Sequence, residues 1–320
     1  MKESNRDRIE ILSVELLDQQ RDLVDQLKDL ASSLKLEFGW HYLLDITWII
    51  TQLGKTAGKQ VVDAGAGIGI LQWYLAGMGS EVISVDRLNR ADLPLRFRSK
   101  YTVEGLRPQD LNPPISTLKT SWSRSTSGAS TSSLPVKIAG FGRRLAEFTF
   151  YYFGELSRKN NPKVQNGMVI IYNQDLSNLV DIEADSIDAV VAVSALEHNS
   201  LDNLEQILAE TMRVLKPGAP LIATLVTAGN EDRWHEPSSG WCLSEASLKR
   251  IFKITGNSSS NFSRYDELFS MLVNCDELKD NLAGFYFKSA KNGMPWGEWS
   301  PEYQPVGIYK LKPAKIGPTL

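Results

Sequence analysis

Three glycines follow an aspartate at alternating positions, in the order Asp63, Gly65, Gly67 and Gly69. Glycines at this spacing form a turn that a bulkier residue could not follow, and such a turn lets the backbone approach a ligand closely. A dinucleotide-binding turn needs the spacing Gly-x-Gly-x-x-Gly, which seats a pyrophosphate on a helix N-terminus, and this sequence lacks the third glycine of that spacing. A carboxylate at position 63 would repel a pyrophosphate, but it could hold an ammonium group, directly or through water.

The residues around this turn have the pattern of a strand, a helix and a second strand. Val61 and Val62 end a short apolar run before the turn. An amphipathic helix is expected from about Ile70 to Met78, and a second strand from Glu81 to Val85 leads to Asp86. Units of this kind bind nucleoside-containing cofactors at the carboxyl ends of their strands. The pattern therefore predicts a cofactor site directly after the first strand.

The series Asp63-x-Gly65-x-Gly67-x-Gly69, with Asp86 closing the next strand, resembles motif I of the class I S-adenosylmethionine-dependent methyltransferases. The resemblance implies that the cofactor is S-adenosyl-L-methionine and that S-adenosyl-L-homocysteine is its product. It also implies that Asp63 and the glycines hold the methionine end of the cofactor, and that Asp86 binds the ribose hydroxyls.

Three later segments are similar to the same family. Asp175 follows the third expected strand, where the family places an acidic residue against the adenine amino group. Residues 195–198 resemble the segment beside the methionine moiety, and residues 215–219 resemble the turn before the fifth strand. The residues that the resemblance assigns to the cofactor are Asp63, Ala64, Gly65, Ala66, Gly67, Gly69, Asp86, Arg87, Asp175, Leu176, Ser194 and Leu196.

The reaction that the family implies displaces the sulfonium methyl group toward an oxygen, nitrogen or carbon of an acceptor. Such a reaction needs mainly alignment and a dry pocket. A base is required only if the acceptor must lose a proton early. His235, in the loop after the fifth strand, and His198 are the two candidate catalytic bases. The alternatives are a loop histidine without a role at position 235 and a histidine that only packs near the cofactor at position 198.

Four aromatic or imidazole side chains are candidates for acceptor contacts. Trp40, His41 and Tyr42 precede the glycine turn, where a helix of the family often covers the methionine end of the cofactor. Trp234 lies in the loop that often faces the acceptor. For residues 40–42 an aromatic helix that packs against the sheet is an equal alternative.

A long basic segment, residues 87–166, separates the second strand from the third, which is expected at Gly167–Tyr172. Its length exceeds that of a compact connection between two strands. It contains 14 basic and 5 acidic residues, a net charge of +9, so the rest of the chain carries −12 of the total of −3. Residues 117–135 are low in sequence complexity, and residues 137–159 have the spacing of a helix with one aromatic face. A cationic lobe favours an anionic substrate, nucleic acid or an anionic membrane surface, contacted through 137–159. The alternative is a solvated basic cap.

The remaining patterns complete a fold prediction. Residues 6–37 have helical spacing, which predicts an N-terminal helical extension over 1–37. Helices are expected at Asn203–Val214 and, with Ser244 as N-cap, at Glu245–Phe252. The last strands are expected at Phe285–Phe287 and Val306–Tyr309.

The expected fold class is therefore α/β. We predict a Rossmann-like, seven-stranded, mostly parallel sheet between helices, with a basic helical and low-complexity insertion after the second strand. In this division residues 38–86 and 167–312 form the cofactor-binding domain, and residues 87–166 form a cap or a lobe that faces substrate or membrane.

Composition narrows the class of protein. A hydrophobic content of 42% supports a core, and two cysteines with three histidines do not favour a disulfide framework or a metal centre. The first residues lack the apolar core of a signal peptide, and no long apolar run suggests a membrane span, so the sequence predicts a cytoplasmic protein.

The expected function is methyl transfer to a small-molecule acceptor, such as an anionic, glycosyl or lipid-linked intermediate. One alternative is a nucleic-acid or protein methyltransferase. The sequence Ser-Ala-Leu-Glu from position 194, in place of an Asn-Pro-Pro-Tyr-type tetrapeptide, disfavours a nucleic-acid acceptor. The other alternative is a non-catalytic scaffold that retained the cofactor-binding fold. The sequence leaves the oligomeric state open.

Overall fold

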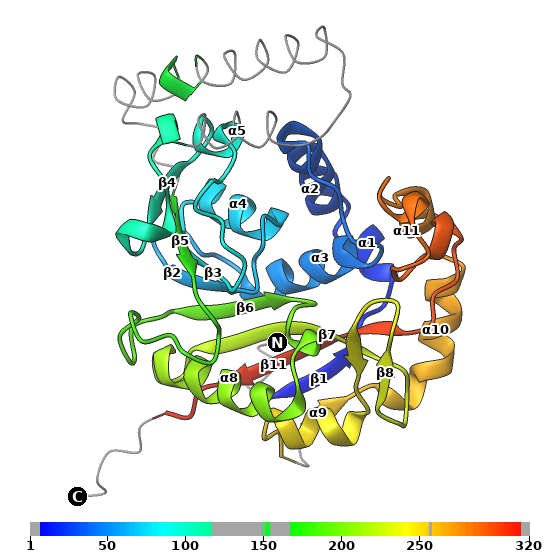
Figure 1. The fold of residues 1–320 in the computed structure, drawn as a ribbon. Helices are drawn as coiled ribbons and strands as arrows, with labels where there is room; N and C mark the ends of the chain where they lie inside the picture. Colours follow the sequence, from blue (N-terminus) through cyan, green and yellow to red (C-terminus); the bar gives the residue numbers. More distant parts are fainter. Residues whose placement is uncertain (1–6, 117–148, 150, 154–166, 256–257, 315–320) are drawn as a thin grey trace, which may run out of the picture.

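One twisted sheet runs through the molecule, and helices cover both of its faces (Figure 1). The computed structural model describes residues 7–116, 149, 151–153, 167–255 and 258–314. The strands are β1 (Arg8–Ile11), β2 (Gln60–Ala64), β3 (Glu81–Asp86), β4 (Thr102–Gly105), β5 (Met168–Asn173), β6 (Ala189–Val193), β7 (Pro220–Thr227), β8 (Arg233–His235), β9 (Gly240–Cys242), β10 (Ser259–Ser260) and β11 (Gln304–Leu311). Nine of them follow the order β10-β1-β11-β7-β6-β2-β3-β5-β4, and the β8–β9 hairpin joins β7 through β9.

The centre of the sheet is parallel. Strands β4, β5, β3, β2, β6 and β7 all run in one direction, and β11 is antiparallel to β7. The central strands are almost continuous apolar runs, as Ala189–Val193 illustrates, because both of their faces are covered by helices. The carboxyl ends of parallel strands meet at one edge of the sheet, so the residues that follow these strands converge there.

Two helical layers bury the two faces of the sheet. The α-helices are α1 (Glu15–Gln19), α2 (Arg21–Leu34), α3 (Tyr42–Leu53), α4 (Ile70–Gly77), α5 (Leu95–Arg98), α8 (Leu201–Val214), α9 (Glu245–Ile251), α10 (Tyr265–Val273) and α11 (Asp276–Asp280). The 3-10 helices are η1 (Pro108–Asp110), η2 (Leu196–His198), η3 (Phe262–Arg264), η4 (Tyr286–Lys288) and η5 (Pro295–Gly297). In Figure 1, α2, α3 and α4 lie on one side of the sheet, and α8 and α9 lie on the other. Alternate strand residues enter the two cores: Val61 packs with the first group of helices and Val62 with the second.

The structure confirms the mostly parallel, Rossmann-like α/β fold, and the expected elements at 61–86, 167–172 and 203–252 lie where the sequence placed them. The sheet has eleven strands within the described residues instead of seven. The prediction of a helix from residue 6 was wrong at its start. Arg8–Ile11 is a strand between β11 and β10, because Ile9 and Ile11 alternate with polar residues and bury the same face. Four residues are too few for the strand period to stand out from the helical spacing that follows.

The strand expected at Phe285–Phe287 was also wrong. Residues 286–288 form η4, in which Tyr286 is buried while Phe285 and Phe287 are exposed. Strand β11 is instead flanked by β1 and β7. The strand expected at Val306–Tyr309 is confirmed as part of β11.

The first part of the basic segment belongs to the sheet. Strand β4 pairs with β5, so residues 102–105 form the sheet edge instead of a separate lobe. Arg90 and Arg98 are 6% and 7% exposed, which removes them from any cationic surface. The low-complexity stretch 117–135 lies outside the described residues, as does the helix expected at 137–159, apart from residues 149 and 151–153, which are helical. None of the helices that the structure describes is both long and apolar enough to cross a membrane.

Candidate active site

A cavity of about 700 Å³ opens at the carboxyl ends of β2, β3, β5 and β6. It is lined by the glycine turn, by the residues that follow β3, β5 and β6, by the segment before α3 and by residues around η4. The sequence-predicted site residues that line it are Asp63, Gly65, Ala66, Gly67, Gly69, Asp86, Arg87, Asp175, Leu176, Ser194, His198, Trp40, His41 and Tyr42. The structure thus brings together most of the residues that were singled out.

Four of the predicted site residues do not line the cavity. Ala64 and Leu196 are buried in the core on the α8 side of the sheet. His235 is 3% exposed, and its Nδ1 lies 2.7 Å from the hydroxyl of Ser238. Trp234 is 41% exposed and donates its Nε1–H to Glu236. The assignment of these four residues to direct ligand contacts therefore receives no support from the cavity lining and stays a prediction.

The glycine turn depends on backbone freedom at one position above all. Gly65 has a φ of +75°, and a Cβ atom built there would lie 2.4 Å from the Cβ of Ala195. The turn after β2 therefore packs directly against the segment that follows β6, and only glycine fits between them.

Asp86 holds the turn from the neighbouring strand. One carboxylate oxygen, Oδ2, accepts a hydrogen bond from the Gly67 amide at 2.8 Å, and Oδ1 accepts one from the Leu88 amide at 2.8 Å. The side chain also lines the cavity, where lone pairs of the same oxygens remain for a ligand hydroxyl.

Two residues that the sequence did not single out hold the glycine turn in place through hydrogen bonds to its carbonyl groups. Gln72 donates its Nε2–H to the Gly69 carbonyl at 3.1 Å, and its Oε1 accepts a hydrogen bond from Ser84 at 2.8 Å. Arg90 donates to the Gly67 carbonyl at 2.9 Å and to the Ser84 carbonyl at 2.7 Å. In the sequence Arg90 was one cation among many, and nothing in its neighbours marks it as buried.

The pKa values of the charged residues packed beneath the glycine turn depend on one another. Asp63 is 2% exposed, and burial raises the pKa of its carboxyl group to about 7. Arg90 opposes this rise in pKa, whereas the like charge of Asp86 adds to it. Burial lowers the pKa of Arg90, which Asp86 and Asp63 counteract. A ligand ammonium group beside Asp63 would favour the charged carboxylate.

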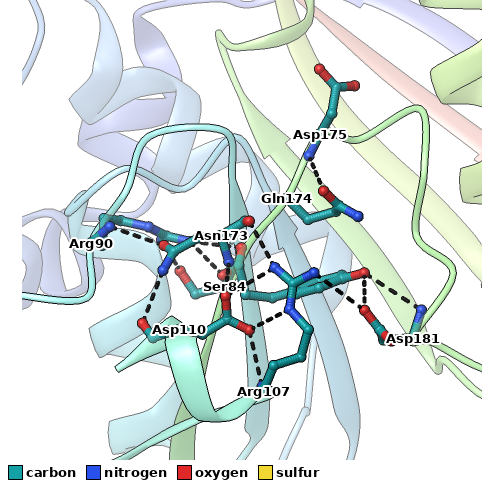
Figure 2. A network of polar contacts seen from close by, with 9 residues as sticks. Ser84, Arg90, Arg107, Asp110, Asn173, Gln174, Asp175 and Asp181 are labelled. Carbon is teal, nitrogen blue, oxygen red and sulfur yellow. Dashed lines mark hydrogen bonds and ion pairs between the residues drawn. The ribbon is translucent and has the colours of Figure 1, made fainter. Parts of the chain in front are cut away.

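A second buried network anchors the loop after β5 (Figure 2). The 0%-exposed Asp110 accepts hydrogen bonds from Arg107 Nε and Nη2, both at 3.0 Å, and from the Asn173 amide at 3.1 Å. Burial would raise the pKa of Asp110, but these hydrogen bonds outweigh it and the pKa is lowered. Arg107 also donates to the Asn173 carbonyl at 2.9 Å. The edge strand β4 and η1 therefore fix the chain that leads into Asp175.

Asp175 lines the cavity two residues beyond this anchor. Its Oδ1 accepts hydrogen bonds from the amide and the hydroxyl of Ser177, at 2.9 and 2.7 Å. These bonds lower the pKa of Asp175, so the group is ionised at neutral pH. Its Oδ2 has no hydrogen bond to the described residues and is available to a ligand donor.

The opposite half of the cavity is lined by aromatic side chains. Trp40 donates its backbone N–H to the Tyr286 hydroxyl at 2.9 Å and its Nε1–H to the Tyr303 hydroxyl at 3.1 Å. Burial raises the pKa of Tyr286 to about 12, and it also raises the pKa of Tyr42 and Tyr303. All three phenols are therefore neutral at physiological pH.

Polar groups interrupt this aromatic wall at two places. His41 Nδ1 lies 2.7 Å from Asp45 Oδ2, and the two residues are 3% and 0% exposed. Glu197 is 2% exposed and is hydrogen-bonded to the hydroxyl of Ser194. Ser194 itself has a φ of +42°, an unusual backbone conformation for serine, of the kind that occurs at functional sites. Neither Asp45 nor Glu197 carried a sequence signal of its own.

The two candidate bases lie in different environments. His198 is exposed and lines the cavity, and its Nδ1 lies 2.9 Å from the Ser239 carbonyl, which leaves Nε2 free to accept a proton. His235 lies behind Ser238 and Tyr303, with its ring centroid 5.0 Å from that of Tyr303. Burial lowers the pKa of His235. The predicted acceptor-facing loop does reach the cavity, but through Pro237 and Ser238.

Residues 150–223 match the family model of a methyltransferase domain. The match includes strands β5 and β6, which lie in the same sheet as the strand before the glycine turn, and helix α8. The protein is a methyltransferase. Its cofactor is S-adenosyl-L-methionine.

No curated protein matches the sequence. Among solved structures, the methyltransferase is similar to the YcgJ protein from Bacillus subtilis, at 14% identity over 84% of this chain and 98% of that chain, with a TM-score of 0.41. It is similar to a SAM-dependent methyltransferase from Aquifex aeolicus, at 14% identity over 72% and 86%, with a TM-score of 0.36. A third similar structure is 1,6-didemethyltoxoflavin-N1-methyltransferase from Burkholderia thailandensis, at 16% identity over 75% and 73%, with a TM-score of 0.37.

Proposed function

We propose that the methyltransferase acts on a small-molecule acceptor, which binds beside S-adenosylmethionine in the same cavity. The observation that carries this proposal is the continuity of the cavity: the glycine turn and the aromatic wall line one space of about 700 Å³. Pockets of roughly 300–1,000 Å³ are typical of small-ligand sites. The aromatic half remains for an acceptor once the glycine-turn half holds the cofactor.

The residues of the glycine-turn half suit the three parts of the cofactor. Asp63 offers a buried carboxylate to the ammonium group of the methionine end. Asp86 offers carboxylate oxygens to the ribose hydroxyls, and Asp175 offers its Oδ2 to the adenine amino group. These assignments follow the motif, and the contacts of each carboxylate leave room for them.

The chain itself contributes alignment and exclusion of water. When bound, the cofactor supplies an activated methyl group on its sulfonium. The walls of Trp40, Tyr42, Tyr286 and Tyr303 enclose the space beside it with apolar surface and neutral phenols. An acceptor held there loses freedom and bulk solvent before the reaction, which is the main requirement of a methyl transfer.

An anionic acceptor receives little support from the cavity. Apart from histidines, the charged side chains that line it are Glu37, Asp63, Asp86, Arg87, Asp175, Glu197 and Lys291. Acidic groups outnumber basic ones, and Arg90 and Arg107 of the basic segment are used within the fold. Contact with an anionic membrane through 137–159 stays a separate proposal, because that segment lies almost wholly outside the described residues.

Calorimetric titration tests the cofactor half of this proposal. S-Adenosylmethionine and S-adenosylhomocysteine should each bind one site per chain, and NAD should not bind. The glycine spacing and Asp63 exclude a pyrophosphate, so tight binding of NAD would contradict the site assignment. Binding of neither nucleoside ligand would contradict the function.

A further inference from the structure

An aspartate–histidine pair lies in the acceptor half of the cavity. His41 precedes α3 and Asp45 lies within its first turn, so the two side chains share one face of the helix. Asp45 Oδ2 accepts from His41 Nδ1 at 2.7 Å, which places the free nitrogen, Nε2, on the other side of the ring. Nε2 has no hydrogen bond to the described residues, while the ring borders the cavity. A histidine held in this way has an oriented lone pair.

A buried carboxylate faces the same space. Glu197 is 2% exposed, and its Oε1 is bonded to Ser194. Its Oε2 is fully buried and has no hydrogen-bond partner among the described residues. A buried carboxylate oxygen without a donor is costly, so its presence in a cavity wall indicates a ligand that supplies the donor.

The surroundings of Glu197 favour a cationic donor. Aromatic rings of Trp40, Tyr42, Tyr286 and Tyr303 line the same half of the cavity. Aromatic faces together with a carboxylate are suited to an ammonium group, because ring quadrupoles attract cations. Desolvation raises the pKa of Glu197, with the neighbouring imidazoles of His198 and His41 and the hydrogen bond from Ser194 acting against it. A bound cation would act in the same direction as those histidines.

We propose that the acceptor of this methyltransferase is an amine, held by Glu197 as its ammonium ion and deprotonated by His41. This proposal rests on the proposed function and narrows its acceptor to basic nitrogen compounds. In the first step the ammonium gives one proton to His41 Nε2, which leaves a neutral amine and an imidazolium that Asp45 stabilises. In the second step the nitrogen lone pair forms a bond to the methyl carbon as the carbon–sulfur bond breaks. The products are a methylated ammonium ion, S-adenosylhomocysteine and an imidazolium that returns its proton to water.

The amine can be tested with three probes of one carbon skeleton: phenethylamine, 2-phenylethanol and phenylacetate. Each is titrated into the full chain saturated with S-adenosylhomocysteine. The amine should bind at least about tenfold more tightly than the alcohol or the acid, a difference of about 1.4 kcal/mol. Equal or tighter binding of the alcohol or the acid, or binding of none of the three, overturns the proposal.

The role of Glu197 is tested by Glu197→Gln, which keeps a partner for Ser194. This variant should lose the preference for phenethylamine and keep its affinity for S-adenosylhomocysteine within about twofold. Glu183→Gln is the matched control, since Glu183 is exposed and does not line the cavity. If Glu197→Gln binds phenethylamine as the wild type does, Glu197 is not the recognition group. If the wild-type protein does not bind S-adenosylhomocysteine at all, the proposed function itself is overturned.

The steady-state kinetics of phenethylamine methylation test His41 and its positioning residue Asp45. His41→Asn should lower the rate about a hundredfold, as loss of a general base does. Asp45→Asn should lower kcat at least about tenfold and keep the KM for phenethylamine within about twofold, because Asp45 orients the imidazole without touching the amine. An unchanged kcat in either variant, or a KM that changes in Asp45→Asn while kcat does not, overturns the role of the pair.

Discussion

The two halves of the cavity are built in different ways. The cofactor half is made largely of backbone: a glycine turn, two strand ends and the loop after β5, all from adjacent parallel strands. The acceptor half is made of side chains from segments far apart in the sequence, residues 37–42, 194–198 and 285–303. A backbone site constrains residue types at fixed spacing, whereas a side-chain site requires only that the fold bring its members together. The first kind can be read from a sequence, and the second emerges from the structure.

Among the predicted variants, Gly65→Ala should weaken cofactor binding most, because it alters the backbone of the cofactor half. The new Cβ would lie 2.4 Å from Ala195 at a φ of +75°, so the turn must move. We expect affinity for S-adenosylhomocysteine, measured by calorimetry, to fall more than about a hundredfold, or about 2.7 kcal/mol. Gly58→Ala is the control, because Gly58 has a φ of +76° and no atoms within 4 Å of its Cβ position. Equal losses in both variants would mean that backbone strain, and not the close approach, is responsible.

Removal of the buried cation beneath the turn should lower the stability of the fold as well as the affinity for the cofactor. Arg90→Met deletes the hydrogen bonds to the Gly67 and Ser84 carbonyls and leaves the charges of Asp63 and Asp86 without their buried cation. Breaking such a buried set costs roughly 3–5 kcal/mol of stability. Thermal unfolding with and without S-adenosylhomocysteine should show a lower melting temperature and weakened binding. An unchanged melting temperature would show that Arg90 does not support the turn.

The sequence predicted the parts of the site that are built from backbone and missed the side chains that only the packing brings together. The turn at 63–69 was predicted because φ > 0 and a close approach leave only glycine, and Asp86 because its strand ends beside that turn. Arg90 and Gln72 were missed, since their burial depends on how β3 and α4 pack.

The acceptor half was anticipated at Trp40, His41, Tyr42 and His198. Glu197 lies in a segment that was recognised, but its unpartnered oxygen is a property of the folded cavity. Tyr286 was assigned to a strand because a short run of aromatic residues is typical of strands, whereas the structure places it in η4. Arg8–Ile11 was taken for helix because its pairing with β10 and β11 joins residues that are far apart in the sequence.

The pH dependence of cofactor binding tests the role of the Asp63 carboxylate in the cofactor half. The pKa of Asp63 is raised to about 7, so the carboxyl group is protonated below this pH and cannot pair with an ammonium group. Affinity for S-adenosylhomocysteine should therefore fall about tenfold per pH unit below about pH 7 and level off above it. Asp63→Asn should bind weakly and without this dependence. An affinity in the wild type that stays constant from pH 5 to pH 8 would contradict the raised pKa.

The smallest effect is expected in the acceptor wall. Tyr303→Phe removes the hydroxyl that accepts the Trp40 indole N–H at 3.1 Å, which should cost about 1 kcal/mol of unfolding free energy. Tyr74→Phe, with no hydrogen bond from its hydroxyl to the described residues, is the control and should change little. Affinity for S-adenosylhomocysteine should stay within about twofold in both. A large loss of cofactor binding in Tyr303→Phe would show that the halves are not separate.

A crystal structure of the complex with S-adenosylhomocysteine tests the division of the cavity most directly. The ammonium end should lie at Asp63 and Gly65, the ribose at Asp86 and the adenine at Asp175, with the sulfur facing an open space bordered by His41 and Glu197. A ligand that fills the aromatic half, or that binds away from the glycine turn, would contradict the account.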